Sequence, residues 1–171
     1  TDVNSLTSFD SDGVTLGSAG SSNATGVTSV AWNWKAGGTP TTDNLVAAGG
    51  TPTAGSVKID GANLGSALAG TIAATRLSAS TTAGFSIAGF VGSGASATVA
   101  HGLSSAPELV IVKNRDVADH WTVGNSDFTS WDYYMYLNDT RAQTLDANKF
   151  GTASTASVFT VGSSSSTNQS T

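Results

Sequence analysis

The 171 residues suffice for one domain, or for one compact domain with an extension, and they carry a net charge of −5 with only 11% charged residues. The charges are spread evenly without a basic patch, which argues against nucleic acid as a partner. The chain contains no cysteine, which excludes disulfides and Cys-based metal sites, and no apolar run is long enough to span a membrane. Abundant Gly, Ser, Thr and Ala with few charges favour a β-rich protein of a virion or of the extracellular space.

A strand–turn–strand pattern covers residues 8–17, with DSDG as the turn. Asp10 and Asp12 make a candidate calcium site, because Ca²⁺ binds closely spaced carboxylates. The pattern offers no third acidic ligand at calcium-loop spacing and no closing Glu, and Asp-Gly is by itself a favoured turn. The sequence therefore favours a turn over an ion, and no cofactor is expected.

Residues 27–35 form a predicted strand on which Val30, Trp32 and Trp34 share one face. Two Trp side chains at this spacing could stack on a sugar. A Trp buries up to about 250 Å² and dominates any small core, so we favour a role in packing for these residues.

Three segments are expected along the chain: an N-terminal β segment (1–36), a connector rich in Gly, Ser, Thr and Ala (37–82), and a β-sandwich domain (83–171). Apolar residues recur every four to five positions within 56–78, which is loosely helical. Three glycines interrupt this stretch, and each costs about 1 kcal/mol in a helix interior. The pattern favours a strand-and-turn arm, or a short helix packed against a neighbouring subunit.

Residues 84–115 are the most regular part of the sequence. Alternating apolar residues at 85–91 predict a half-buried strand, and residues 97–101 a second one. The continuous, β-branched run at 109–112 is too short for a helix and predicts a strand buried on both faces. We therefore expect a mainly β fold, an antiparallel sandwich or jelly roll with an extended N-terminal arm.

Four phrases of the sequence, TTAGFSI, TVAHGLSSAPELVIVKNRD, SFDSDGVTLG and VAWNWKAGG, resemble a repeated domain in large structural proteins of marine tailed bacteriophages. Those proteins are of the tail-fibre or appendage type. The resemblance implies a virion context and a β-rich fold, and it implies neither a catalytic mechanism nor a ligand.

The segment 127–136 is dense in aromatic residues. Trp131 and Tyr133 are expected on one face of a strand, and Tyr134 and Tyr136 on the other. Exposed aromatics on a surface of low charge favour a subunit interface or a glycan site. The alternative is that both faces belong to the core.

An internal repeat links the two ends of the chain. Residues 14–26 and 159–171 align without gaps at a shift of 145, with Gly17 matching Gly162 and Asn23 matching Asn168. In the resembling family an aromatic strand of the VAWNW kind follows this phrase. We therefore predict that residues 27–35 complete a sheet formed mainly by residues 83–162, either in their own chain or in the next subunit.

Catalytic groups are sparse. His101 lies between two predicted strands without a GxSxG phrase, and its imidazole is expected to bind the local backbone. His120 and Asp119 lack further metal ligands at a known spacing. A glycosidase pair would need carboxylates that only the fold could bring together. We expect no enzymatic activity.

These observations lead to one main hypothesis, a structural subunit of a phage fibre or appendage that assembles with itself through strand addition and β-sheet interfaces. A second hypothesis is a carbohydrate- or receptor-binding module on a virion, with a host-surface glycan as partner. A third is a secreted or surface filament subunit of cellular origin. The expected location is a virion or the extracellular space.

Overall fold

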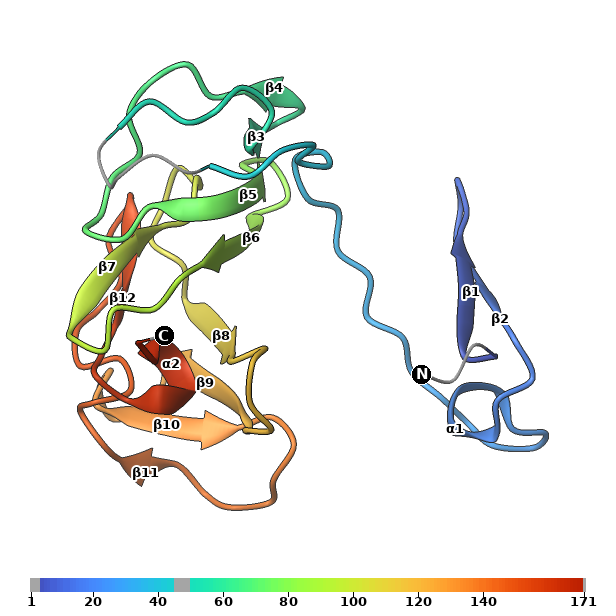
Figure 1. The fold of residues 1–171 in the computed structure, drawn as a ribbon. Helices are drawn as coiled ribbons and strands as arrows, with labels where there is room; N and C mark the ends of the chain where they lie inside the picture. The colour runs from blue at the N-terminus through green and yellow to red at the C-terminus, as the bar shows by residue number, and fades with distance from the viewer. Residues whose placement is uncertain (1–3, 45–49, 171) are drawn as a thin grey trace. The chain divides into compact units, whose positions relative to one another are not determined.

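The computed structural model describes residues 4–44 and 50–170, and its regular structure is almost entirely β (Figure 1). The sheets are antiparallel apart from one parallel pair of strands, which confirms the expected mainly β, sandwich-type fold class. The chain divides into two compact units, Thr1–Asn33 and Trp34–Thr171.

The first unit contains a hairpin of β1 (Leu6–Phe9) and β2 (Val14–Leu16), followed by one turn of helix, α1 (Gly20–Asn23). This confirms the predicted strand–turn–strand. The Asp10 amide donates to the carbonyl of Gly13 (2.9 Å), and its carboxylate accepts hydrogen bonds from the hydroxyls of Thr15 (2.7 Å) and Ser8 (2.9 Å). These hydroxyls hold the pKa of Asp10 below its usual value.

The described residues of the second unit form three sheets, with strand orders β4-β3-β5-β6, β12-β7 and β11-β10-β9-β8. Its elements are β3 (Val57–Ile59), β4 (Ala62–Asn63), β5 (Ala74–Ser80), β6 (Phe85–Phe90), β7 (Ala97–Ala100), β8 (Leu109–Lys113), β9 (Trp121–Asn125), β10 (Tyr133–Tyr136), β11 (Thr144–Leu145), β12 (Val158–Val161) and α2 (Ser165–Asn168). Strands β6 and β8 are therefore the ends of their respective sheets.

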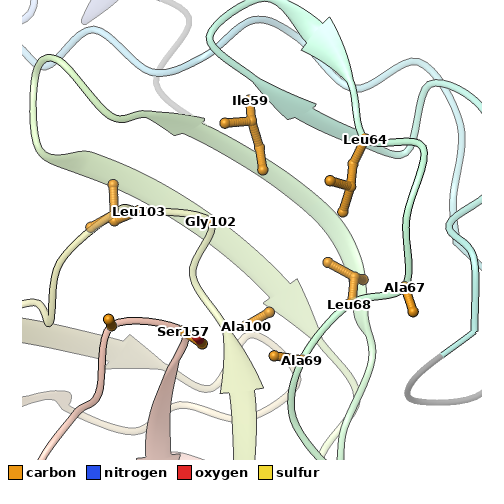
Figure 2. A pocket seen from close by; sticks show the side chains of 10 residues that line it. Ile59, Leu64, Ala67, Leu68, Ala69, Ala100, Gly102, Leu103 and Ser157 are labelled. Atoms are coloured by element: carbon orange, nitrogen blue, oxygen red, sulfur yellow. The ribbon is translucent and has the colours of Figure 1, made fainter.

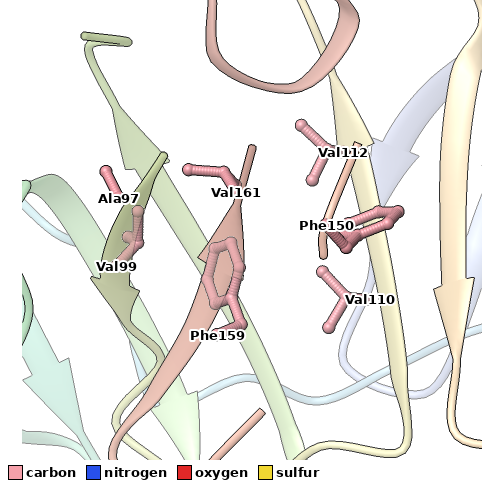
Figure 3. Close-up of a cluster of buried hydrophobic side chains, with 7 residues drawn as sticks. All are labelled: Ala97, Val99, Val110, Val112, Phe150, Phe159 and Val161. Carbon is pink, nitrogen blue, oxygen red and sulfur yellow. The ribbon is translucent and has the colours of Figure 1, made fainter. Parts of the chain in front are cut away.

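Two clusters of apolar side chains form the core of this unit. The first contains side chains of β7, β8 and β12 together with Phe150, which is 1% exposed and lies beside Val110 and Val112 of β8 (Figure 3). In the second, Val57, Leu77 and Ala79 pack with the end of β7. Because β7 contributes to both clusters, it links the two larger sheets of the unit.

The prediction that the run 109–112 is buried on both faces is wrong. Val110 and Val112 are 7% exposed, whereas Leu109 and Ile111 are 51% and 40% exposed. Alternate residues of a strand point to opposite faces, and within the described residues only one face of β8 belongs to a core cluster. A continuous apolar run shows that both faces are apolar, but not that both are covered.

Residues 57–80, which lie within the predicted connector 37–82, contain strands and turns, as the pattern of 56–78 favoured. This stretch forms β3, β4 and β5, and the buried Leu77 lies within it. Asp60 and Gly61 have positive φ angles (51° and 87°), which suit the tight turn between β3 and β4. The hydrophobic pattern of the sequence indicates these strands only weakly, because they are rich in Ala, Ser and Thr. Strand β5 is buried mainly by its neighbours β3 and β6 rather than by large side chains of its own.

The internal repeat has the same local structure in both copies. The α1 and α2 turns occupy equivalent positions at the shift of 145, after β2 and β12. The side-chain amide of Asn23 donates to the carbonyl of Gly17 (2.9 Å), as that of Asn168 donates to Gly162 (3.0 Å). A Cβ on Gly17 would overlap the carbonyl of Asn4, and one on Gly162 the carbonyl of Asn148, so both positions require glycine. The repeat is therefore a structural unit and not a chance match of Ser-rich sequence.

Candidate functional site

The structure places His101 in a structural role. Its Nδ1 accepts a hydrogen bond from the amide of Leu103 (3.0 Å), so the proton lies on Nε2, which contacts the carbonyl of Thr155 (3.0 Å). The residue is 3% exposed, and burial lowers the pKa of its imidazole against the opposing effect of the Thr155 bond. The predicted backbone contacts of His101 are confirmed.

The aromatic segment contributes to the core, which was one of the two alternatives for it. Trp131 and Tyr134 both pack against the first core cluster, and burial raises the pKa of Tyr134. The His120 ring stacks on the Tyr136 ring, with centroids 4.2 Å apart, and the Arg141 guanidinium lies 5.0 Å from the same ring. Trp131 and the strand residues Tyr133, Tyr134 and Tyr136 are all half-buried, so none of them forms an open platform.

A buried lysine was not anticipated from the sequence. Lys149 is 8% exposed, and its ammonium group donates to the hydroxyls of Ser166 (2.7 Å) and Ser164 (2.9 Å) beside the Tyr134 ring. A Ser–Lys pair can act as a nucleophile and base. Ser166 is 2% exposed here, so the arrangement fastens α2 to the core rather than presenting a reactive hydroxyl. A lone Lys in a loop gives no sequence signal of this role.

The predicted strand 27–35 is not a strand in the structure. Val30, Trp32 and Trp34 are highly exposed, at 78%, 67% and 59%, so the expectation that they pack in a core is wrong for this chain. The Trp34 ring stacks on the Phe85 ring at the start of β6, with centroids 5.3 Å apart and planes 9° from parallel. This segment therefore presents large apolar groups to solvent, which is the property of an interface.

One edge of β6 has no partner strand among the described residues. β6 pairs only with β5, and Ile87 and Val91 are 58% and 54% exposed. A groove of about 570 Å³ runs between 88–92, at the end of β6, and 111–116, at the end of β8, with Phe159 and Asn168 also lining it. The groove thus lies between the end strands of two different sheets.

A second, smaller cavity of about 200 Å³ is lined mainly by apolar side chains, including Ile59, Leu64, Leu68 and Leu103 (Figure 2). Figure 2 shows these side chains converging from β3, from the loop after β4 and from the turn after β7. It contains no charged residue, so it suits an apolar group rather than a polar ligand.

No group of three potential metal ligands was found among residues 4–44 and 50–170, and no helix in this part of the chain is long and apolar enough to cross a membrane. Asp10 and Asp12 lie in the turn between β1 and β2, where the Asp10 carboxylate accepts hydrogen bonds from the hydroxyls of Ser8 and Thr15.

The fold and these surfaces define a β-rich domain with a sheet edge that no described strand pairs with, and with an apolar, exposed N-terminal segment. Residues 54–171 match the family described as a domain of unknown function, DUF7483. The match covers more than half of the chain, so the protein belongs to this family. No curated protein and no solved structure matched the sequence.

Proposed function

We propose that the chain is a non-catalytic structural subunit of a phage fibre or appendage, which assembles with itself by strand addition. The observation that carries this proposal is the exposure of Val30, Trp32 and Trp34 on a segment that belongs to no sheet. A free sheet edge on the same molecule supplies a place where such a segment can be accepted.

The energetics support this assembly. Covering the exposed part of Trp32 alone removes about 170 Å² from water, which gives on the order of 4 kcal/mol at about 25 cal/mol per Å². Association itself costs several kcal/mol, so Val30 and the main-chain hydrogen bonds of the added strand are also needed. The sequence resemblance to phage structural proteins supports a virion as the place of assembly.

The glycan-binding alternative has less support. At the segment 127–136 it needs open aromatic faces, whereas the rings of Trp131, Tyr133, Tyr134 and Tyr136 are half-buried. Tyr136 is in addition contacted by His120 and Arg141.

Native mass spectrometry of the full chain and of Trp32→Ser tests the proposal. We expect an oligomer for the unchanged chain and its loss in Trp32→Ser, with far-UV circular dichroism unaltered, because Trp32 contributes to no core cluster. Trp121→Ser is the matched control, since Trp121 is also an exposed Trp (46%) but lies on β9. A monomeric unchanged chain, or equal dissociation by both variants, would contradict strand addition through residues 27–35.

A further inference from the structure

We propose that residues 4–25 are a closing module for another domain of the same family, one whose core has strands like β7 and β8 but no such module of its own. Closing module here means residues 148–170, which complete the core of the second unit, and their equivalents 4–25 in the first unit. This interface is separate from strand addition through residues 27–35, and it goes beyond the function proposed above.

The two modules have the same backbone hydrogen bonds. The amide of Gly17 donates to the carbonyl of Ser5 (2.8 Å), as the amide of Gly162 donates to that of Lys149 (2.9 Å). The repeat therefore extends back to residues 4–6, which correspond to 148–150, and the second copy is one residue longer before the turn. Three further pairs of bonds correspond: 10 to 13 and 155 to 158, 19 to 4 and 164 to 148, and 23 to 19 and 168 to 164.

The apolar side chains of the first module are exposed where those of the second are buried. Phe150 and Val161 are 1% and 0% exposed within the first core cluster. Leu6 and Leu16 occupy the equivalent positions and are 45% and 42% exposed. The first module thus has the apolar pair with which the second covers a core, but the described residues leave this pair open to solvent. Such an exposed apolar face is typical of an interface.

The module also has an unpaired strand edge at the corresponding place. Strand β12 pairs with β7, with Val161 opposite Ala97. Strand β2 pairs only with β1 among the described residues. Because Gly17 and Gly162 donate to equivalent carbonyls on the β1 side, the remaining edge of β2 corresponds to the edge of β12 that binds β7. A strand like β7 therefore fits this edge.

The asparagine at the end of each helical turn indicates the same kind of partner. The Asn168 side chain accepts a hydrogen bond from the Ser93 amide (2.7 Å) and donates one to the Ala95 carbonyl (2.5 Å), and it is 1% exposed. Asn23 makes the equivalent inner bond to Gly17 but is exposed, and among the described residues its side chain binds no loop of this kind. It is in position to bind a loop like 93–95 of another domain.

The partner has no closing module of its own, because a core that is already closed offers no place for a second one. Residues 54–171 match the family and include the module 148–170, which fills this place in the second unit. In a core without it, the faces of β7 and β8 that carry Val99, Val110 and Val112 are uncovered (Figure 3). In the equivalent register Leu6 takes the place of Phe150 beside the last two.

Cross-linking of full-length chains tests the proposal, because the natural chain has no cysteine. The donor is Leu16→Cys. The acceptor is Ala97→Cys with Gly17→Val and Gly162→Val, since a side chain on either glycine overlaps a carbonyl and neither of its own modules can then form. Donor and acceptor are mixed in denaturant, refolded together and oxidised, and the products are identified by intact mass. Opposed residues on paired strands lie close enough for a disulfide, so we expect a donor–acceptor heterodimer.

Leu16→Cys with Gly17→Val is the matched control donor, because it keeps the cysteine and spoils the module that carries it. We expect about tenfold less heterodimer from this donor, since a disulfide requires the two strands to be held at a defined distance. Equal linking by the control donor would show that the cysteines react without the module, and the proposal would be overturned.

A milder acceptor keeps the test valid if the first acceptor does not fold. It carries Asn168→Ala in place of Gly162→Val, which weakens its own closing module without blocking it. Its heterodimer should be less abundant but should depend in the same way on Gly17 of the donor. Absence of the heterodimer with both acceptors overturns the proposal. The Trp32-dependent oligomer is measured separately, because none of these substitutions lies within residues 27–35.

Discussion

Replacing Phe150 by Ala tests the position of the main core. The ring is 1% exposed within the first cluster and meets Trp131 edge-on, with centroids 6.1 Å apart. Removing a buried Phe costs about 3–5 kcal/mol, to which the lost aromatic pair contributes about 0.5–1.5 kcal/mol. Since domains are stable by only about 5–15 kcal/mol, the variant should lose a large share of its stability.

The assay is urea unfolding at neutral pH, followed by tryptophan fluorescence and by circular dichroism. We expect the midpoint to fall strongly at an unchanged slope, and the melting temperature to fall by about 10 °C. Leu145→Ala is the control, since Leu145 is 63% exposed and its loss should cost less than about 0.5 kcal/mol. A loss below about 1 kcal/mol for Phe150→Ala would refute the idea that this cluster holds the second unit together.

Three further predictions follow from named contacts. Val110→Ala should lower the free energy of unfolding by about 2 kcal/mol, and Ile111→Ala by less than about 1 kcal/mol in the isolated chain. A larger loss for Ile111→Ala would mean that another chain covers the outer face of β8. Burial lowers the pKa of His101 in the folded protein. The contribution of His101 to stability is therefore complete above the unfolded pKa of about 6.5, and it is lost as the pH falls from there towards the folded pKa. The His101→Gln variant should show a flatter dependence of the urea midpoint on pH between about pH 5 and 8. Asn168→Ala should cost about 1–3 kcal/mol because it leaves buried backbone groups without partners, whereas the equivalent Asn23→Ala, at an exposed site, should change the urea midpoint little.

The strands with large alternating side chains could be predicted from the sequence. The pattern at 85–91 predicted β6, and the Asp-Gly of the DSDG phrase predicted the turn between β1 and β2. Periodicity could not tell which face would be covered, because that depends on segments distant in the chain. Ile111 and Val110 are both apolar, and only the approach of β12 and Phe150 makes Val110 the buried one.

Strand β5 is buried although its sequence pattern indicates little burial. Its residues are mostly small, so their hydrophobic signal is weak, yet Ala74, Leu77 and Ala79 are fully buried between neighbouring strands. The spacing of Val30, Trp32 and Trp34 predicted a packed strand, whereas these residues are exposed and lie in no strand. The free edge of β6 and the role of Lys149 could not be predicted, because both arise from contacts that no local pattern encodes.

The pairing of β7 with β12 has a consequence for how the protein is made. Residues 97–100 find their partner only at 158–161, and the Ser93 amide meets Asn168 at a separation of 75 residues. During synthesis at about 5–20 residues per second, the ribosome therefore releases β7 several seconds before β12 exists. Throughout that interval β7 of the nascent chain has no β12 to pair with, and the core is incomplete. Closely spaced ribosomes on one messenger RNA would therefore favour pairing between neighbouring nascent chains before β7 and β12 of one chain can pair.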